Sequence, residues 1–544
     1  MEFNYKFKNS SAVNSTKDNT SMNFSPDLNR EPTFFVALLK EQVLFREAIS
    51  ALHDVVVSDM KFKPSDKSDY KAWLLSQENG WLAKLVADKE KHQKGYDKIS
   101  RELSKLREKE NTILKPYYDA QSEYFNYLYT HDKDKWFVLD PVITVHPDEV
   151  FFECFSQDES SYGKLSCSYD TFKDIKEHSF GTTNIDYSDN LYNEFQKIRD
   201  YKDTTFSIDP SGFEVSTELS EEFKEEKIDL PDSWVRGFLQ ISSAMSMDKH
   251  SFTLQPMDMY NILLILKRNK EKKSPRSLRF ILTPNKPIEL IFEPWGKKIK
   301  FSRSIYQGTS QQEIRIWGRR RLFILERLLP IAKSFKISLL GSGMPSFWEA
   351  DLGNMVFTLG LSGWSSNDWS GSANFDLLSP RAKVDSQTSQ KVFDSLSQDY
   401  VQTSSSLAKK LNLDKTIIES SLNIYSQYGR VLYDMNKDTY RLRELSNEPL
   451  PIDKLQFENE TEKKASNLVL ANLVEIITIE QTDNQKSIQA KVIDNAKTYE
   501  TTLTIDQDLK LKNATCQCWF YKQNKLYKGP CEHILASRIM GDRG

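Results

Sequence analysis

Cysteine and histidine are scarce in this chain. Its 544 residues include five cysteines and seven histidines. So few cysteines cannot supply the dense disulfide framework of a small secreted domain. We also find no secretory leader and no apolar run suited to spanning a membrane, so we expect reduced thiols and a cytoplasmic location.

The chain also lacks a large excess of charge of either sign. The formal net charge is -3, with 39% hydrophobic and 28% charged residues, which is ordinary for globular proteins. This balance excludes a uniformly basic coat for nucleic acid, so any such contact must come from local patches. The length predicts several domains.

Three of the cysteines and one histidine gather in CQCWFYKQNKLYKGPCEH. One residue separates Cys516 from Cys518, twelve residues follow, and one residue separates Cys531 from His533. Three thiolates and one imidazole suit tetrahedral Zn²⁺, and the fourth protein ligand leaves no open position for a water nucleophile. We therefore predict one structural zinc ion per chain, held by these four residues.

The flanking sequence predicts the local structure of this site. The stretches SIQAKVID and TYETTLTI alternate apolar and polar residues, which is typical of half-buried strands. Pro530 precedes CEHILASRIM, whose apolar stripe indicates a helix. The ligand spacing behind a strand pair and before a short helix resembles the SWIM zinc finger, a small β-β-α module, over about residues 488–540.

Other stretches extend the resemblance along the chain: ALHDVVVSDMKFKP, HPDEVFFECFSQDESSYG, EIRIWGRRRLFILERLLP, FTLGLSGWSSNDWS and GRVLYDMNKDTYRLREL. Together they resemble bacterial SWIM zinc-finger proteins found alongside MoxR-type AAA ATPases and von Willebrand A-domain proteins in conflict systems. The resemblance implies a non-enzymatic adaptor or target-recognition component, acting in antiviral defence with an ATPase and an A-domain partner.

The finger also carries a local basic and aromatic cluster. Lysines and aromatic residues that alternate in this way can bind phosphates while stacking on bases, of DNA or RNA. The alternative is that the aromatic rings fill the small core around the metal. The candidate contact residues are Trp519, Lys522, Lys525, Tyr527, Lys528 and Arg538.

The overall pattern predicts an α+β multidomain protein with a helical N-terminal region, a mixed α/β middle, a winged-helix-like unit and a C-terminal β-β-α zinc finger. Residues 81–128 indicate a long, charged helical hairpin. The expected divisions are a disordered tail (1–30), a helical and β-rich domain (31–233), an α/β domain (234–384), a winged-helix-like domain (385–450) and the finger domain (451–544).

A cluster of acidic residues around His146 raises the possibility of an enzyme. It runs from His146 to Glu159 and includes Asp148, Glu149 and Glu153. Its spacing matches no metal site, and alternating strand residues explain the pattern as well. Converging carboxylates in a cleft would favour an enzyme, whereas alternation along a buried strand would not. The two other cysteines, Cys154 and Cys167, are predicted to be buried, reduced thiols.

Two segments of the middle region invite an anion-binding interpretation. The loop from Lys267 to Arg279 has seven basic residues and one acid, Glu271. It suits either an anion-binding patch or a solvated helix end whose cations complement the helix dipole. The glycines of GSGMPS do not form a phosphate loop, because no Lys-Ser or Lys-Thr pair follows them.

Residues 385–448 have the element order of a winged helix, namely two helices, a turn between them, and a strand pair. Between Leu407 and Leu445, seven basic residues meet five acidic ones. This small excess gives little electrostatic support to a sequence-specific DNA-binding regulator. Packing against a protein surface explains the unit equally well.

Overall fold

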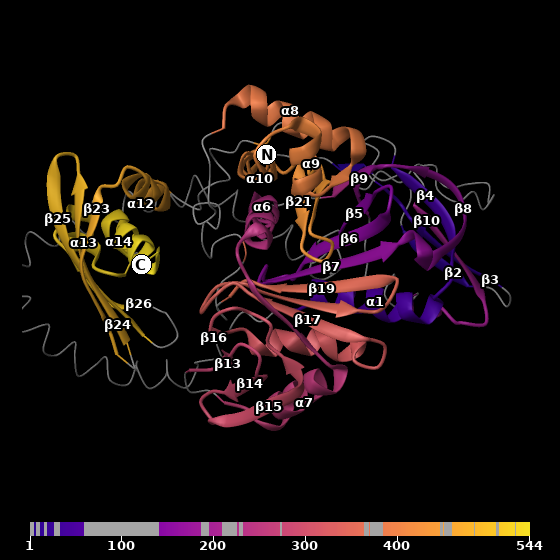
Figure 1. Ribbon diagram of the computed structural model, residues 1–544, viewed down its shortest axis with the longest axis horizontal. Coiled ribbons are helices and arrows are strands. Elements are labelled where there is room, and N and C mark those ends of the chain that lie inside the picture. Colours follow the sequence, from indigo (N-terminus) through magenta and orange to yellow (C-terminus); the bar gives the residue numbers. More distant parts are fainter. Residues whose placement is uncertain are drawn as a thin grey trace, which may run out of the picture. The chain divides into compact units, whose positions relative to one another are not determined.

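The chain folds as a mixed α/β protein with several sheets (Figure 1). The computed structural model describes residues 5–6, 11–15, 19–26, 33–58, 141–185, 195–208, 226–227, 232–271, 275–363, 369, 384–446, 450, 460–482, 485–506, 511–527 and 529–543. None of the helices in these ranges is long and apolar enough to cross a bilayer. The helical hairpin expected at residues 81–128 lies outside these ranges. Of the predicted helical N-terminal region, the described residues therefore contain α1.

An eight-stranded antiparallel sheet runs through the largest part of the protein, in the order β12-β17-β18-β19-β7-β6-β5-β9. Its strands are β5 (Val142–Val145), β6 (Glu149–Phe155), β7 (Ser161–Ser168), β9 (Gly181–Asn184), β12 (His250–Leu254), β17 (Ser334–Leu339), β18 (Ser346–Asp351) and β19 (Met355–Leu361). Strand β7 pairs with β19 along its length. The expected boundary between residues 233 and 234 is therefore wrong as a division between cores, because one sheet contains strands from both sides.

A second sheet, of five strands, corrects the prediction for the N-terminal segment. Its order is β2-β3-β10-β4-β8, with β2 (Ala12–Ser15), β3 (Asn19–Phe24), β4 (Phe34–Leu39), β8 (Phe172–Ser179) and β10 (Asp203–Ile208). Residues 1–30 were expected to be disordered, yet β3 pairs in parallel with β10 and buries Met22 and Phe24 completely. A strand needs an apolar residue only at alternate positions, so a polar composition is compatible with a paired strand.

Helix α1 (Gln42–Val56) joins these sheets through its apolar face. Phe45, Ile49 and Leu52 are fully buried, and the helix contacts β6, β7 and the 3₁₀ helix η2 (Arg319–Leu328). The remaining short elements of this part are β1 (Tyr5–Lys6), η1 (Tyr169–Thr171) and β11 (Glu226–Lys227). The fold therefore builds one apolar core from chain segments that are far apart in the sequence.

The middle region contains the helix and the strand that the sequence predicts on the two sides of the basic loop. Helix α7 (Pro256–Arg268) starts with Pro256 and a capping box, and it precedes a four-stranded sheet of order β15-β14-β13-β16. The strands are β13 (Leu278–Leu282), β14 (Pro287–Phe292), β15 (Lys297–Ile305) and β16 (Gln312–Ile316). Lysine and arginine are frequent on β15, which lies at the edge of this sheet.

The segment 384–446 has the predicted helix pair and strand pair. Its elements are α8 (Ser386–Asp399), β20 (Val401–Gln402), α9 (Ser404–Leu411), α10 (Lys415–Gln427), β21 (Val431–Asp434) and β22 (Thr439–Leu442). Asp414 caps α10, and Gly429 ends it with φ +70°. Helix α10 packs against α6 (Asp232–Ser246), and Gln427 Nε2 donates to the Leu239 carbonyl at 3.4 Å.

The C-terminal segment forms a four-stranded sheet of order β23-β24-β25-β26 with helices beside it. The elements are α12 (Glu460–Leu470), β23 (Val474–Gln481), β24 (Gln485–Asp494), β25 (Lys497–Asp506), β26 (Leu511–Cys516), α13 (Trp519–Asn524) and α14 (Glu532–Arg543). Asn495 and Ala496 both have positive φ, as a tight strand-to-strand turn requires. The predicted strand pair and final helix are therefore present, and α14 packs on β24.

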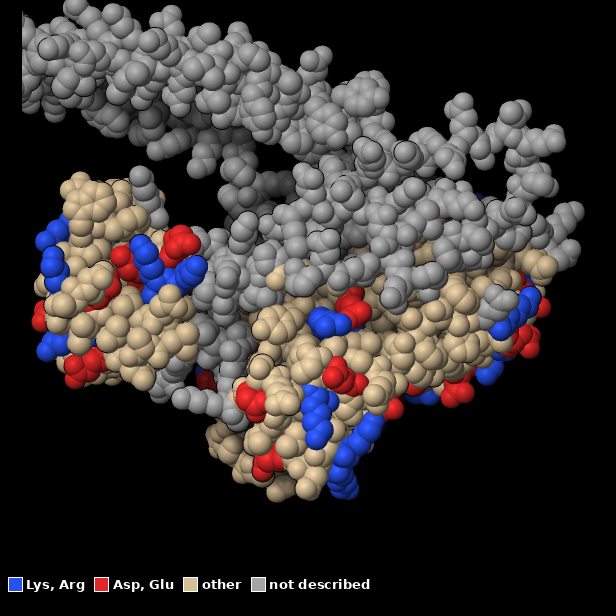
Figure 2. Space-filling model, turned by 90° about the horizontal axis from the view of Figure 1, so that it is seen from above, with Lys and Arg blue, Asp and Glu red and all other residues tan. Residues whose placement is uncertain are grey.

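Charged side chains of both signs are interspersed over the described residues on the face shown in Figure 2. No broad basic surface covers the described residues of this face. The picture agrees with the nearly neutral net charge of -3 and with the expectation that any contact with a polyanion is local.

Candidate metal centre

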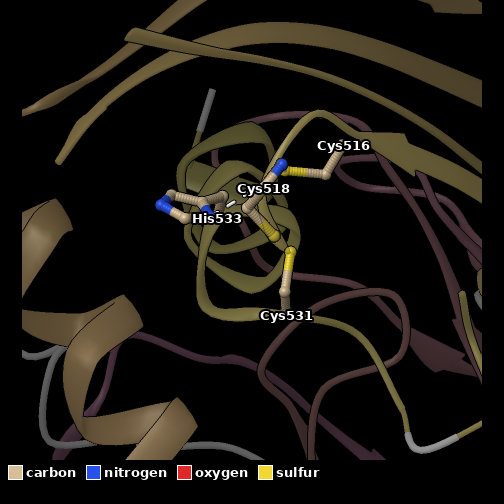
Figure 3. Close-up of side chains that lie close together, drawn as sticks. All are labelled: Cys516, Cys518, Cys531 and His533. Atoms are coloured by element: carbon tan, nitrogen blue, oxygen red, sulfur yellow. Dashed lines mark hydrogen bonds between the residues drawn. The ribbon is translucent and has the colours of Figure 1, made fainter. Parts of the chain in front are cut away.

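Four element ends bring the predicted ligands together (Figure 3). Cys516 ends β26, Cys518 caps α13, Cys531 directly precedes α14, and His533 lies in the first turn of α14. All four side chains are buried. Their potential ligand atoms lie within 4.8 Å of one another, so this cluster can hold a metal ion.

The spacing of the ligand atoms fits a tetrahedral ion. Zn–S bonds of about 2.3 Å and Zn–N bonds of about 2.0 Å place a sulfur and a nitrogen ligand of a tetrahedron about 3.5 Å apart. Cys516 Sγ lies 3.8 Å from His533 Nδ1. The donor set of three soft sulfurs and one imidazole is also one that Zn²⁺ prefers.

Local backbone groups favour thiolates at this position. The N–H of Cys518 donates to Cys516 Sγ at 3.4 Å, and the N–H of Tyr521 donates to Cys518 Sγ at 3.3 Å. The neighbouring Cys516 thiol, followed by burial, raises the pKa of Cys531 to about 12. Burial also raises the pKa of Cys518, so the thiols of Cys518 and Cys531 ionise at neutral pH only when a cation compensates their charge.

Asp494 contacts the Cys/His cluster and was missed by the sequence analysis. His533 directs Nδ1 toward Cys516, while Nε2 lies 3.3 Å from Asp494 Oδ2. A carboxylate on the second imidazole nitrogen fixes the ring orientation and makes the first nitrogen a better metal ligand. The Tyr499 ring, with its centroid 4.2 Å from that of His533, restricts the imidazole further.

The aromatic residues near the metal ligands divide into two groups. Phe520 and Tyr521 pack against the core of this segment. In contrast, Trp519 is 74% exposed and Tyr527 is 95% exposed. The interpretation that the aromatic rings fill the core is therefore wrong for Trp519 and Tyr527.

The predicted contact lysines lie on the same short stretch. Lys522 and Lys525 are exposed, and the Lys525 ammonium lies 5.2 Å from the centroid of the Tyr521 ring. Arg538 is half-buried on α14. Lys528 lies outside the described residues. Trp519, Lys522, Lys525 and Tyr527 thus form an exposed aromatic and basic surface, which we call the finger tip.

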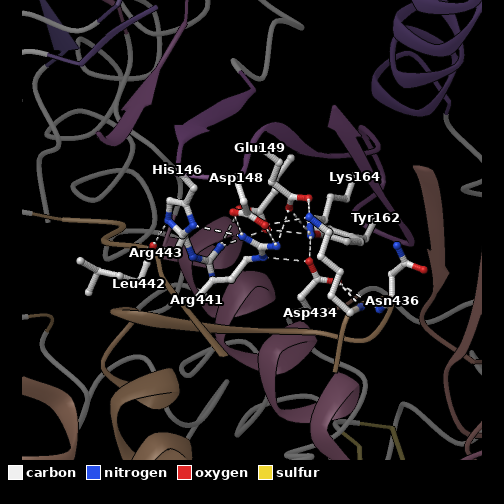
Figure 4. Close-up of polar contacts among 12 residues, drawn as sticks. His146, Asp148, Glu149, Tyr162, Lys164, Asp434, Asn436, Arg441, Leu442 and Arg443 are labelled. Atoms are coloured by element: carbon white, nitrogen blue, oxygen red, sulfur yellow. Dashed lines mark hydrogen bonds and ion pairs between the residues drawn. The ribbon is translucent and has the colours of Figure 1, made fainter. Parts of the chain in front are cut away.

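The second predicted cluster, around His146, forms a buried network of matched charges (Figure 4). Arg441 Nη1 lies 2.8 Å from Asp148 Oδ1, and its Nε lies 2.8 Å from Asp434 Oδ2. Arg443 Nη1 lies 3.2 Å from Glu153 Oε2, and both side chains are fully buried. The acids of β6 and its preceding turn therefore bind the β21–β22 hairpin.

The protonation states in this network follow from its contacts. Burial acts to raise the pKa of Asp148, but the hydrogen bonds and charges of Arg441 and Lys437 outweigh it and hold the pKa well below its usual range. Burial, with the Arg441 charge, lowers the pKa of His146 to about 3. His146 Nε2 donates to the Leu442 carbonyl at 2.6 Å, so the imidazole is neutral and held in one tautomer.

The other end of the acidic stretch caps a turn. Asp158 accepts hydrogen bonds from the Ser156 and Ser160 hydroxyls, each at 2.6 Å. Cys154 and Cys167 are free, fully buried thiols, as predicted, and burial raises the pKa of each well above its usual value. The cluster is thus built of paired or capped groups along buried strands.

The fold and this centre define a mixed α/β protein with a four-residue Cys/His cluster that can hold a metal ion. No protein-family model matches the chain, and a search of curated proteins gives no match. Among solved structures, the chain is similar to the proliferating cellular nuclear antigen of Entamoeba histolytica, at 11% identity and a TM-score of 0.32, over 60% of this chain and 98% of that one. A TM-score of 0.32 supports no conclusion about fold or function.

Proposed function

We propose that this protein is a non-enzymatic, zinc-binding target-recognition component whose C-terminal segment is a SWIM-type finger. The observation that carries the proposal is the convergence of four buried ligands, Cys516, Cys518, Cys531 and His533. Four protein ligands fill a tetrahedral shell, so the zinc ion has a structural role and offers no position for a substrate.

Zinc would connect parts of the segment that have few other contacts. The local core around the ligands is small, and the cysteines themselves belong to it. Helix α13 has six residues, none of them buried, so its own packing contributes little stability. Zinc bound to Cys518 and Cys531 would hold α13 and the following turn, and with them the finger tip, against the sheet.

Elemental analysis of Cys531→Ser tests the zinc proposal. We expect one zinc ion in the wild-type chain and none in the variant, with lost protection of residues 511–543 in hydrogen exchange. Cys154→Ala is the matched control, because it removes a buried thiol outside the cluster and should keep its zinc. Wild-type protein without zinc, or zinc retained in Cys531→Ser, contradicts the proposal.

The finger tip is the surface that this zinc site would present to a target. Two exposed rings beside two lysines can stack on bases and attract phosphates, so DNA or RNA is one candidate ligand. The resemblance in sequence to SWIM proteins of conflict systems suggests a second class, a MoxR-type ATPase or a von Willebrand A-domain protein. We propose the adaptor role with either class of target.

Charge reversal at the finger tip distinguishes these targets. Lys522→Glu with Lys525→Glu should weaken salt-dependent binding to nucleic acid while zinc content stays unchanged, because neither lysine is a ligand. Two lost phosphate contacts should reduce the slope of log affinity against log salt by about 1.4 on single strands and 1.8 on duplex. Lys491→Glu with Lys497→Glu, exposed on β24 and β25, is the control. An unchanged slope in the tip variant would assign this surface to a protein target.

The alternative functions have less support. In a sequence-specific DNA-binding regulator, α10 and the β21–β22 hairpin would face a duplex. Here α10 packs on α6 instead. The hairpin is bound to β6 and to the turn before it, through Arg441 and Arg443. In an enzyme centred on His146, the carboxylates would need to be available for proton transfer. Their pairing with arginine and lysine weighs against that role.

A further inference from the structure

A second basic surface lies in the middle region, away from the residues of the zinc site in the sequence. It is formed by four exposed cations from separate segments, which we call the basic ridge: Lys270 after α7, Arg276 before β13, Lys297 at the start of β15, and Arg320 in η2. In Figure 1, α7 and the strands β13, β14, β15 and β16 lie in the lower part of the view. The fold, and not a single basic stretch of sequence, therefore supplies the cations of the basic ridge.

The buried residue Arg319 holds three of these segments together. Its guanidinium lies 4.5 Å from the centroid of the Trp295 ring and donates to the carbonyl of Ser277 at 3.3 Å and to that of Glu293. Arg276 adjoins Ser277 and Arg320 adjoins Arg319, so these contacts fix the backbone beneath both exposed arginines. The backbone positions of Arg276 and Arg320 are thus set by the fold.

A further contact connects the fourth segment. Lys297 Nζ donates to Asn269 Oδ1 at 2.8 Å, which links the end of α7 to the start of β15. Lys270 follows Asn269 directly. A solvated helix end explains cations in the last turn of α7, but it does not explain Arg276, Lys297 and Arg320, which belong to other elements.

The nearby carboxylates are largely engaged with other cations. Glu293 lies 2.9 Å from Arg315 and 3.2 Å from Arg279, Lys267 pairs with Glu326, and Lys298 pairs with Glu289 at 2.6 Å. Within the described ranges, no carboxylate forms an ion pair with Lys270, Arg276 or Arg320. Glu271 is the acid closest to the ridge in sequence.

The electrostatic state of Arg319 agrees with a local excess of positive charge. Burial, followed by the charge of Arg276, lowers the pKa of Arg319 to about 10, and Arg320 acts in the same direction against the opposing charges of Glu271 and Glu293. Like charges that repel one another in the free protein are stabilised when an anion binds between them.

We propose that the basic ridge binds the phosphate backbone of nucleic acid, independently of the zinc site. Guanidinium groups present planar, fixed donors that match phosphate oxygens, and cations from separate segments suit a ligand with repeated phosphates. A membrane surface fits less well, because interfacial binding requires exposed apolar side chains beside the cations. On α7 and β15 these are Met257 and Tyr260, in the first half of α7, and Ile305, at the opposite end of β15 from Lys297. The basic ridge would contact phosphates through charge alone, so we expect binding without a preference for base sequence.

The test uses the full chain and labelled DNA, single-stranded and duplex, in fluorescence anisotropy over a salt series. Arg276→Ala with Arg320→Ala should reduce the salt slope by about 1.4 on single strands and 1.8 on duplex, and weaken binding about ten- to a hundredfold at low salt. Lys391→Ala with Lys409→Ala is the matched control, because both lysines are exposed on α8 and α9 and the variant removes the same charge. The control should bind like the wild type.

Two further measurements separate the ridge from the finger tip and from a loss of folding. In the background of Lys522→Glu with Lys525→Glu, the two ridge substitutions should still reduce the remaining affinity, because the ridge lysines and arginines belong to other elements. An unchanged melting temperature in the ridge variant confirms that both exposed side chains were removed without unfolding.

The proposal is overturned if the wild type binds no DNA at low salt, or if the ridge and control variants bind equally well. It is also overturned if the ridge substitutions abolish binding to vesicles of anionic phospholipid and leave DNA binding intact. That result would assign the ridge to a membrane surface.

Discussion

Two clusters in this protein gather ionisable side chains, and they differ in whether those side chains have partners of opposite charge. At the C-terminal cluster, three thiols and an imidazole converge, with their potential ligand atoms within 4.8 Å of one another. Around His146, the carboxylates of Asp148, Glu149 and Glu153 each meet arginine. The first arrangement gathers potential metal ligands, whereas each of these acids in the second has an arginine partner.

This contrast gives a rule for interpreting dense polar clusters. A set of donors that would repel one another when ionised indicates an external ion, whereas a set of alternating charges indicates an internal connection between elements. Arg441 and Arg443 reach from β22 and the residue after it to the strand β6 region, about 290 residues away in the sequence. The network therefore fixes the 384–446 segment onto the large sheet.

The largest effect is expected from breaking a matched pair. Arg443→Met leaves Glu153 buried without its cation, which should cost about 3 to 5 kcal/mol of unfolding free energy. Urea unfolding followed by tryptophan fluorescence measures this change, because Trp234 and Trp348 are buried in the same part of the protein.

The matched control replaces both members of the pair. Arg443→Met with Glu153→Met removes the buried charges together and should recover much of the lost stability. A single variant as stable as the wild type would show that the pair does not hold the hairpin in place.

The next largest effect is expected at the Cys/His cluster. Asp494→Asn keeps the shape of the side chain but removes the negative charge beside His533, and we expect zinc affinity to fall about ten- to a hundredfold. Competition with a chromophoric chelator measures the change. Asp506→Asn, at the far end of β25, is the control and should bind zinc like the wild type. Equal affinities for the two variants would exclude a supporting role for Asp494.

A somewhat smaller effect concerns pH. His146 has a folded-state pKa of about 3, below the ordinary value of 6.5, so the unfolded chain binds the proton more readily. Its contribution to stability is complete above about pH 6.5 and is lost as the pH falls toward 3. Between pH 7 and pH 5 the loss should be about 2 kcal/mol.

The variant His146→Gln isolates this contribution. The difference between wild type and variant cancels the pH dependence of the zinc ligands, which both proteins share. The wild type should lose more stability than the variant between pH 7 and pH 5 in urea unfolding. Identical losses would contradict a neutral, buried His146.

The C-terminal strands, the final helix and the metal ligands could be predicted because their signals are local. Alternation marks β24 and β25, and the four ligands lie within eighteen residues of chain. Asp494 was missed because an aspartate at the end of a strand is unremarkable in sequence, and its partner His533 lies 39 positions away.

The prediction failed where contacts are distant or strands are polar. The pairing of β7 with β19 and the ion pairs of Arg441 and Arg443 join segments with no local sign of one another. The strands near residues 12–24 carry apolar residues at too few positions to stand out from a disordered segment. In both cases, tertiary burial decided the structure and local composition did not.

We propose that the Cys/His cluster holds a structural zinc ion, whereas the His146 network needs no added ion. Elemental analysis of purified wild-type, Cys531→Ser and Arg443→Met proteins tests it most directly. We expect one zinc ion per chain in the wild type and in Arg443→Met, and none in Cys531→Ser. Zinc absent from the wild type, or present at the same level in Cys531→Ser, would contradict it.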